Sequence, residues 1–557
     1  MQPISSAEEA THVLERISTS GYKPLVHAAE SALTCLRPRV LFDDDDKVDE
    51  EVTASTVPTD FEETVQRSCE VVAALNFLAR SSSSRNVRLK LLRIRCYAVS
   101  WMKQIFEVSP EMRRRGSDII QAMGIPDFPW DDIRPGSRGL ALLYNFSPFQ
   151  DTGATVASKR IRNFGCSVDV IACSFLHRKK QDTTVESIAS PYVNRRYFLP
   201  LAPSWASWEP YKAYATKASE LGKKFMESNK GYEFLYTRAM WAPSLYAGAK
   251  FKQDNNQVKW IAEFSDPLSL DVEGLPRGGT IPVDEFTEPL VNWFESRYGQ
   301  IPEDSMTIFK LAELLVYGFA DEIIFTNSHQ KQTMLEHIPS RVLRERVEKH
   351  CIVENHPTLP RGYYEISDSK YDVDDSVLNL AYFGEFYSSR SITEVTSAMR
   401  SLPKCLAQRV NLHVFTNYIP AGDGNRRPRQ FSKIQYEALV KRAHDGVGAQ
   451  GIEDKVHLNA SLPYLEFLST TEQMDYLIVN DARSGEHHAI NPYLPSKWSD
   501  YAGSSAKTWA FVEDGSILSS KPASVKTPVG DSWAARRDLW DMIVAKFPDL
   551  EREVFDS

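Results

Sequence analysis

The sequence lacks long apolar runs and closely spaced cysteines, and each absence excludes a class of protein. Its seven cysteines are scattered and form no CxxC pair, which favours free thiols in a reducing compartment over a disulfide framework or a zinc site. No stretch approaches the roughly 18 consecutive apolar residues of a membrane span. The N-terminus, MQPISSAEEATHVLERI, has early acids and no apolar core, unlike a secretory signal. We therefore expect a cytoplasmic protein.

An excess of positive charge is also missing. The formal net charge is -9, which argues against sequence-independent binding to nucleic acid. The composition, 42% hydrophobic and 25% charged, is that of a globular protein. At 557 residues the chain is too long for one ordinary core, so we expect two or three domains and no nucleic-acid partner.

The segment 1–130 differs from everything after it. Stretches such as EETVQRSCEVVAALNFLAR and RLKLLRIRCYAVSWMKQIFEV have apolar residues at helical spacing. Between them lies the acidic run FDDDDKVDEEVTASTVPTD, in which adjacent carboxylates without turn glycines favour a solvated linker over a metal site. We predict a helical accessory region, and homo-oligomerisation through it is left open.

From Gly139 onward, short apolar strands alternate with amphipathic helices. GLALLYNFSP is a predicted strand and loop, DTGATVASKRIRNFG a helix capped by Asp151 or Thr152, and SVDVIACSF the next strand. The alternation breaks in the Pro- and Asp-rich stretch 357–377 and then restarts. This pattern predicts an α/β fold with two doubly wound parallel sheets. We expect an N-terminal domain at 131–357 and a C-terminal domain at 378–530, joined by a linker at 358–377. A C-terminal helix is expected in 531–557, and its packing on the N-terminal lobe is left open.

In open α/β sheets, ligands bind beyond the carboxyl ends of the strands, so the strand-to-helix turns are candidate sites. The turn after LNLAYF has Gly384 at the strand end and Ser389 and Arg390 just before a helix. Backbone amides at a helix start and a planar guanidinium suit a phosphate. A turn that uses glycine for its geometry alone is the alternative.

The stretch NPYLPSKWSDYAGSS contains the second candidate turn. Pro495 is suited to a helix start and Ser496 to a cap, which leaves the following amides free to face an anion. Lys497 adds a point charge, and Asp500 lies one turn further on the same helical face. An exposed Lys–Asp surface pair is the alternative interpretation of the same residues.

Other clusters are weaker candidates. His487 and His488, with Glu486, are adjacent and lack a third ligand for zinc. The aspartates of KYDVDDS lie in the predicted linker, where a solvated turn is favoured. Asp266 follows a strand and is placed to face a cleft, although a helix cap fits it equally well. We therefore expect no metal site.

Four segments of the chain resemble GT-B glycosyltransferases, especially the large retaining family 4-like group. VHLNASLPYLEFLSTTEQMDYLIVND is similar to the family's block of strand, loop, apolar helix, aspartate and strand, and NPYLPSKWSDYAGSSAKTWAFVEDGS to its pattern F/Y-L-P-S-K-x-x-[DE]-Y. NFSPFQDTGATVASKRIRNFGCSVDVI and DEIIFTNSHQKQTML resemble the opening strand, loop and helix and a later strand ending in T-x-S. The resemblance covers roughly 139–525. It implies two Rossmann-like domains that face a cleft, with the helical region as an N-terminal extension.

The resemblance also implies roles for individual residues. Arg390 and Lys497 would hold the donor diphosphate and act as the catalytic cations, and Asp500 would bind the ribose hydroxyls. By the same resemblance, Thr152 and Gly153 would approach the donor or acceptor, and Asn480 and Asp481 would approach the sugar. The local features described above add Gly384, Ser389, Pro495 and Ser496 as donor-site candidates and Asp266 as a candidate in a donor or acceptor loop.

The implied activity is transfer of a sugar from a nucleoside-diphosphate sugar to a saccharide, lipid-linked or protein acceptor, with retention of configuration. No cofactor or metal is expected beyond this co-substrate, and peripheral contact with the inner face of the membrane is left open. The first acid of the family's E-x7-E motif would fall near Pro492, so this carboxylate is missing from the sequence. Its absence favours an alternative, a non-catalytic GT-B scaffold that acts through its helical region. A nucleotide-dependent epimerase is a third possibility.

Overall fold

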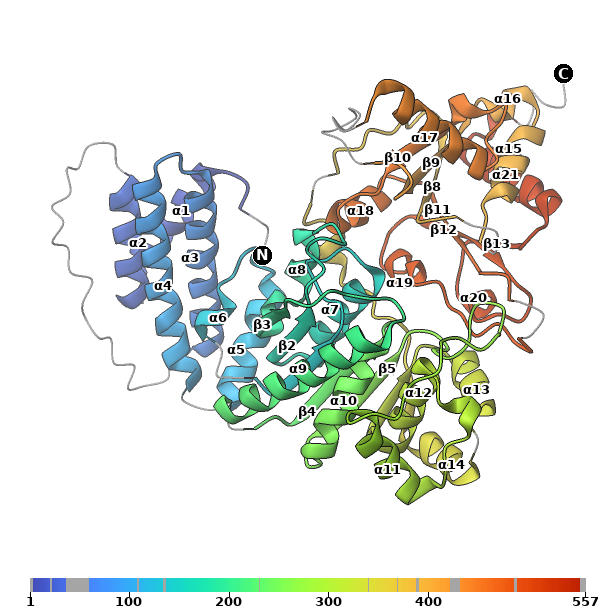
Figure 1. Ribbon diagram of the computed structural model, residues 1–557. Coiled ribbons are helices and arrows are strands. Elements are labelled where there is room, and N and C mark those ends of the chain that lie inside the picture. The colour runs from blue at the N-terminus through green and yellow to red at the C-terminus, as the bar shows by residue number, and fades with distance from the viewer. Residues whose placement is uncertain are drawn as a thin grey trace. The chain divides into compact units, whose positions relative to one another are not determined.

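A computed structural model describes residues 4–20, 23–36, 60–107, 110–133, 137–229, 231–338, 340–367, 369–386, 390–420, 431–484 and 488–550. Its secondary structure is helical before residue 138 and alternates between strands and helices thereafter (Figure 1). The acidic run predicted as a linker lies outside these residues except at Asp60. Among the described residues, no helix is both long and apolar enough to span a membrane.

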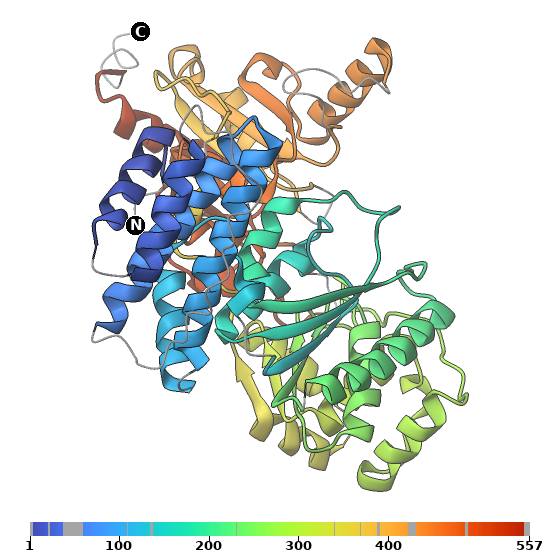
Figure 2. The same cartoon turned by 90° about the vertical axis from the view of Figure 1, so that its left-hand side faces the viewer.

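The helical part consists of α1 (Ala7–Ser18), α2 (Lys23–Leu36), α3 (Phe61–Ser81), α4 (Arg85–Glu107), α5 (Pro110–Met123) and α6 (Trp130–Ile133). Helix α1 packs on α2 and α3, and α4 packs on the same two helices. Helices α1 to α4 therefore form a bundle, as Figures 1 and 2 show. Its core is built from apolar residues at helical spacing, among them Leu14, Val65 and Met102. A predicted helical region is therefore present.

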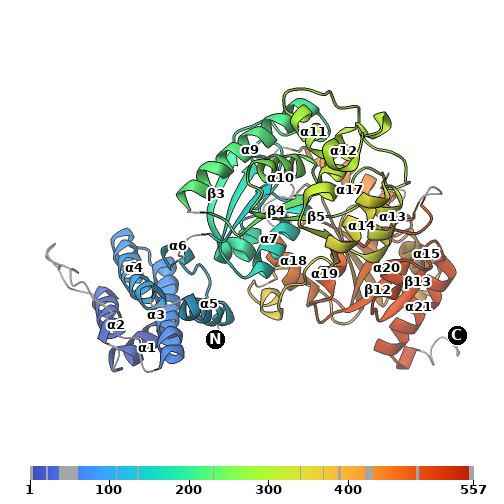
Figure 3. The same cartoon turned by 90° about the horizontal axis from the view of Figure 1, so that it is seen from below.

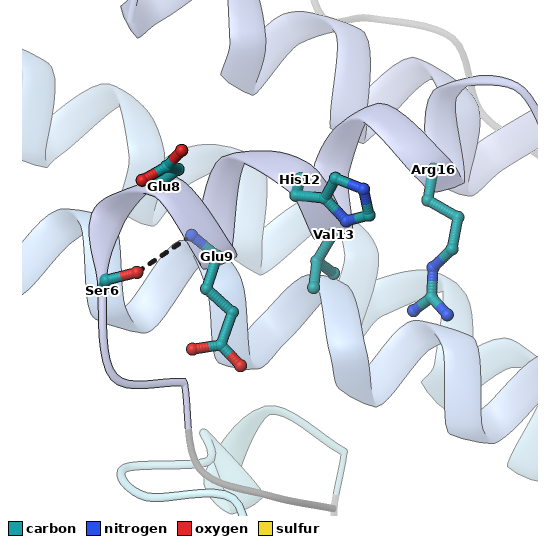
Figure 4. Close-up of a pocket in the computed structure, with 6 residues that line it drawn as sticks. All are labelled: Ser6, Glu8, Glu9, His12, Val13 and Arg16. Atoms are coloured by element: carbon teal, nitrogen blue, oxygen red, sulfur yellow. Dashed lines mark hydrogen bonds between the residues drawn. The ribbon is translucent and has the colours of Figure 1, made fainter.

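A shallow hollow lies on the surface of α1 (Figure 4). Ser6 caps the helix by accepting a hydrogen bond from the Glu9 amide at 3.1 Å. The other side chains that line the hollow project from the same helix: Glu8, His12, Val13 and Arg16. The lining residues all come from α1 and its N-cap, so no second element contributes a side chain to this hollow.

The first sheet has seven strands in the order β3-β2-β1-β4-β5-β6-β7. The pairs from β1 through β7 are parallel. The strands are β1 (Gly139–Leu143), β2 (Val168–Cys173), β3 (Val193–Leu199), β4 (Phe234–Ala239), β5 (Lys259–Phe264), β6 (Glu322–Phe325) and β7 (Cys351–Val353). Strands β1, β2, β4 and β5 are almost wholly buried, as expected for a parallel sheet covered on both faces.

Helices connect and cover these strands. They are α7 (Thr152–Phe164), α8 (Thr183–Ala189), α9 (Trp208–Ser228), α10 (Pro243–Asp254), α11 (Thr287–Tyr298), α12 (Ile308–Phe319), α13 (Ser328–Glu336) and α14 (Arg341–His350). Helices α9 and α10 lie side by side (Figure 3) and contact β1. Asp151 caps α7, as predicted, by accepting a hydrogen bond from the Gly153 amide at 2.7 Å.

The second sheet has six strands in the order β10-β9-β8-β11-β12-β13, all parallel. The strands are β8 (Leu378–Phe383), β9 (Val410–Thr416), β10 (Val456–Ala460), β11 (Tyr476–Asn480), β12 (Lys507–Val512) and β13 (Val525–Pro528). The helices are α15 (Thr393–Ser401), α16 (Lys404–Ala407), α17 (Lys433–Gly446), α18 (Tyr464–Thr471), α19 (Lys497–Tyr501), α20 (Ile517–Ser520) and α21 (Ser532–Lys546). In each sheet the strand order reverses beside the first strand, which creates a crevice at the carboxyl ends.

The C-terminal helix differs from the expectation that it could pack back on the N-terminal lobe. Helix α21 contacts α15, β8 and β13 of the second sheet. Its apolar residues Leu539, Met542 and Ile543 are buried in the core of that lobe. The second sheet would otherwise leave this apolar surface in water, so burying it there is the favourable arrangement.

Candidate active site

A cleft of about 760 Å³ lies between the carboxyl ends of the two sheets and is lined by both lobes. The loops after β1, β4 and β5 contribute from the first lobe, and the loops after β8, β9, β10 and β11 from the second. The predicted site residues that line this cleft are Thr152, Gly153, Asp266, Gly384, Arg390, Asn480, Pro495, Ser496, Lys497 and Asp500. Ser389, Glu486 and His487 lie outside the described residues.

Asp481 is the predicted site residue whose side chain is used elsewhere. Its carboxylate is buried and accepts hydrogen bonds from the Glu513 amide at 2.9 Å and the Ser516 hydroxyl at 2.6 Å. Burial raises its pKa to about 6. Asp481 therefore closes the turn that follows β12. The neighbouring Asn480 lines the cleft and donates a hydrogen bond to the Ser391 carbonyl, which ties β11 to the turn that contains Arg390.

Lys497 and Asp500 form the pair expected from their spacing in α19. The Lys497 Nζ lies 4.0 Å from Asp500 Oδ2 and 4.3 Å from the centre of the Phe467 ring. Burial lowers the pKa of Lys497, although Asp500 opposes this effect. A cation held between a ring face and a carboxylate has a fixed position, so an anion that enters the cleft meets it without a rotamer search.

Ser496 occupies the N-cap position of α19, but its side chain makes no capping hydrogen bond. The predicted side-chain cap is therefore wrong. Its φ and ψ are -59° and -29°, which are helical values, whereas a capping hydroxyl needs an extended N-cap residue to reach the third amide. The Ser496 carbonyl instead accepts a hydrogen bond from the Ser499 hydroxyl at 2.9 Å.

Asp500 has a second cation that the sequence did not reveal. Its Oδ1 accepts hydrogen bonds from Lys159 Nζ, at 2.5 Å, and from the Tyr464 hydroxyl, at 2.6 Å. Lys159 belongs to α7 of the first lobe and is 1% exposed. Burial opposes ionisation of Asp500, but Lys159 and Lys497 outweigh it and lower its pKa. The predicted ribose contact is thus occupied by a buried ion pair between the lobes.

Further hydrogen bonds join the lobes around the cleft. The Tyr464 and Leu465 amides at the start of α18 donate to Asp182 Oδ2, at 2.7 Å, and Thr184 Oγ1, at 3.2 Å. The Pro492 carbonyl accepts a hydrogen bond from Asn327 Nδ2 at 3.0 Å. Loops of the first lobe therefore hold the second lobe's loops in place.

Three arginines approach Asp266 from separate segments of the chain. The surrounding protein raises the pKa of Asp266, and Arg238, Arg390 and Arg277 oppose that effect. All four residues line the cleft, and Asp266 is accessible to water within it. Three guanidiniums around one carboxylate leave a local excess of positive charge, which suits an anion with more than one charge.

Arg238 is anchored from below by a buried ionic network. Its Nε lies 3.5 Å from Glu263 Oε1, and its Nη2 lies 3.2 Å from His356 Nε2. Glu263 also pairs with Arg160 at 3.1 Å and accepts from the Tyr236 hydroxyl at 2.7 Å. Burial opposes ionisation of Glu263, but the arginines lower its pKa to about 2. The network fixes one cation of the cleft wall.

Local sequence patterns did not identify Lys159, Arg277 and His356 as cleft residues. Lys159 and Arg160 are consecutive in a helix whose basic residues suggest an exposed face. Arg277 lies in an irregular loop, and His356 in the Pro-rich stretch predicted as a linker boundary. His488, from the adjacent histidines considered as a weak candidate, hydrogen-bonds the Asp271 carbonyl at 3.2 Å. No group of three metal-ligating side chains occurs in the described ranges.

Two Rossmann-like parallel sheets whose carboxyl ends face a common cleft define the GT-B architecture. The α/β fold class predicted from the sequence is confirmed. The roles predicted for individual residues remain predictions, since the cleft fixes where they lie and not what they bind.

Comparison with known proteins gives distant structural similarity. No protein-family model and no curated protein matches the sequence. The chain is similar to UDP-GlcNAc 2-epimerase from Neisseria meningitidis bound to UDP-GlcNAc, with 10% identity, coverage of 74% of this chain and 92% of that one, and a TM-score of 0.39. It is also similar to the UDP-forming α,α-trehalose-phosphate synthase from Burkholderia xenovorans in complex with glucose-6-phosphate. Here the identity is 9%, the match covers 75% of this chain and 95% of that one, and the TM-score is 0.44. Similarity at this level assigns neither a substrate nor a role to any residue.

Proposed function

We propose that the protein is a GT-B glycosyltransferase that uses a nucleoside-diphosphate sugar. The observation that carries the proposal is the gathering of cations from both lobes in one cleft, with Arg238 and Arg277 from the first lobe and Arg390 and Lys497 from the second. Guanidiniums match the oxygens of a diphosphate, and a cleft of about 760 Å³ has the size of a small-molecule site.

In the proposed reaction, Arg390 and Lys497 neutralise the charge that develops on the leaving diphosphate as its bond to the sugar C1 breaks. An acceptor hydroxyl enters from the first lobe and forms the new bond to C1 on the same face, so configuration is retained. Its proton passes to the departing phosphate oxygen, which balances the exchange. Since fixed cations perform the electrostatic work, the proposal needs no metal, and activity should persist in EDTA.

A thermal-shift screen with UDP-, GDP-, ADP- and TDP-sugars tests the proposal, because a ligand that binds the native state raises its melting temperature. One nucleotide should stabilise the protein, and Arg390→Ala and Lys497→Ala should each weaken that ligand's affinity about tenfold or more. Exposed residues provide matched controls: Arg341→Ala, whose side chain is 91% exposed, and Lys433→Ala, at 82%. Equal affinity in all four variants would remove the diphosphate assignment.

Asp266→Asn tests the position of the diphosphate more sharply. The substitution keeps the side-chain shape and removes a negative charge from among the three arginines. If the diphosphate lies there, the affinity for the nucleoside diphosphate alone should rise, because a like charge disappears. Unchanged or weaker affinity would place the diphosphate elsewhere in the cleft.

A non-catalytic GT-B scaffold is the second candidate, and the state of Asp500 favours it. This carboxylate is buried against Lys159 and Tyr464, and Pro492 stands where the family has an acid. A scaffold predicts partner binding without turnover of any nucleotide sugar, whereas a transferase predicts product formation or slow donor hydrolysis. Isomerisation of a UDP-sugar without an acceptor would instead indicate an epimerase.

A further inference from the structure

Two tryptophans form an aromatic surface beside the cleft. Trp205 follows β3 and Trp241 follows β4, so both lie at the carboxyl edge of the first sheet. Their ring centroids are 4.3 Å apart with an interplanar angle of 36°. The Trp205 side chain is 51% exposed, an unusual exposure for so large an apolar ring.

Lys179 connects this surface to the cleft wall. Its Nζ lies 5.3 Å from the Trp205 ring centre and 5.8 Å from that of Trp241, and it forms an ion pair with Asp151. Lys179 and Asp151 line the cleft, together with Met240, which immediately precedes Trp241. The tryptophans are thus continuous with the side of the cleft that the first lobe supplies.

The surface combines the two features that bind a pyranose ring. The C–H groups of one sugar face are weakly electropositive and apolar, and they pack on the electron-rich face of an indole. Hydroxyls at the ring edge need polar partners, and the Lys179 ammonium and Asp151 carboxylate supply a donor and acceptors within the same surface. Because these two charges neutralise each other, the site favours an uncharged sugar over an anion.

A purely structural role explains these residues less fully. Lys179 also lies 5.6 Å from the buried Phe175 ring and is already paired with Asp151, so its position does not require a half-exposed indole. The Trp205 backbone carbonyl in turn accepts a hydrogen bond from the Tyr211 hydroxyl, which holds this loop in place whatever the Trp205 side chain does.

We propose that Trp205 and Trp241 form an acceptor subsite for a neutral pyranose ring, with Lys179 and Asp151 bonding its hydroxyls. This inference rests on the proposed function and narrows its acceptor from any saccharide, lipid or protein to one that presents a neutral pyranose near the transferred sugar's site.

Saturation-transfer NMR with methyl pyranosides of glucose, mannose, galactose and N-acetylglucosamine tests the subsite on the full chain, with and without the nucleotide that stabilises it. We expect at least one glycoside to bind in the wild type, about tenfold weaker binding in Trp205→Ala, and partial recovery in Trp205→Phe. The matched control is Trp533→Ala on α21 of the second lobe, whose tryptophan is 79% exposed. It should bind the glycoside as the wild type does.

The two proposals fail in distinguishable ways. Absence of any nucleotide-induced thermal shift contradicts the donor site while leaving glycoside binding measurable. A normal nucleotide shift in Trp205→Ala, combined with unchanged glycoside affinity, contradicts the acceptor subsite alone. Absence of glycoside binding to the wild type at roughly 100 mM also overturns the subsite, because weak monosaccharide sites are detected well below that concentration.

Discussion

Each lobe buries a polar cluster in its parallel sheet, but the cluster of the first lobe is charged and that of the second lobe is neutral. In the first lobe, Arg160, Arg238 and Glu263 form a charged network under the cleft. In the second lobe, His413 Nε2 donates a hydrogen bond to Asn379 Oδ1 at 2.9 Å, and His413 Nδ1 lies 2.7 Å from the Tyr371 hydroxyl. Burial lowers the pKa of His413 to about 3, so its ring is neutral.

This difference teaches what each cluster is suited to do. A charged network is costly to bury and still more costly to break, so it holds Arg238 rigidly at the cleft. A neutral network avoids the cost of buried charge but becomes unfavourable when its histidine must take a proton. We therefore expect the Arg160–Glu263–Arg238 set to be sensitive to removal of a charge and the His413 network to be sensitive to acid.

The largest expected effect follows from removing the central acid of the charged network. Glu263→Ala leaves Arg160 and Arg238 without their shared buried carboxylate and should lower the free energy of unfolding by about 4 kcal/mol. Glu263→Gln keeps the shape and should cost nearly as much, because charge pairing matters more than the hydrogen bond. Urea unfolding measures both, and a loss below about 1 kcal/mol would contradict the ionic interpretation.

Lys159 extends the charged set into the second lobe and gives the next largest effect. Lys159→Met removes the cation that meets Asp500 and should destabilise the protein by about 3 kcal/mol. Adding Asp500→Asn should restore part of that loss, since the unpaired carboxylate is then gone. The measurement is a double-mutant cycle in urea. Strictly additive effects would show that the pair makes no net coupling across the cleft.

As the pH falls, stability should be lost at the buried histidines before it is lost at Glu263. The unfolded state takes up a proton at His413 below its ordinary pKa of 6.5, whereas the folded state does not until about pH 3. Stability is therefore lost as the pH falls through 6.5, at up to about 1.4 kcal/mol per pH unit from this residue. Glu263, with its pKa lowered from 4.5 to about 2, adds its own loss only below about pH 4.5.

Urea unfolding of the wild type and His413→Gln between pH 7 and pH 5 measures the histidine contribution. His356 at the cleft also has a pKa lowered to about 3 by burial and by Arg238, so the variant should reduce the slope by about one proton and leave a remainder. An unchanged slope in His413→Gln would mean that the histidine is already protonated in the folded second lobe.

The smallest effect is expected for an ion pair in water. Arg341 and Glu345 lie on α14 of the first lobe, with side chains 91% and 59% exposed. Solvent screens such a pair, so Arg341→Ala should leave the melting temperature within experimental error. A loss comparable to that of Glu263→Ala would remove burial as the reason for the difference between charged pairs.

Much of the fold follows from local patterns, and the exceptions have physical reasons. The buried runs at β1, β2, β4, β5 and β8 are apolar in sequence because parallel strands are covered on both faces. Strand β3, with the sequence VNRRYFL, was not predicted, because it lies at the sheet edge and keeps polar side chains partly exposed.

The sequence predicted the candidate site as two strand-to-helix turns. The structure adds side chains from distant segments, which no local sequence pattern identifies. Gly384, Arg390 and Lys497 were chosen because they follow strands at the sheet edge where ligands bind, and they do line the cleft. Lys159 and Arg160 are consecutive in α7, yet they are 1% and 2% exposed and face different carboxylates.

The sequence by itself determined the alternation of strands and helices, because the spacing of apolar residues decides which backbone conformation can bury them. Only the tertiary structure decided that Lys159 meets Asp500, 341 residues away, and that three arginines gather around Asp266. Hydrophobic spacing acts over a few residues, whereas the partner of a buried charge is set by the packing of whole lobes, and the cost of leaving that charge alone enforces the match.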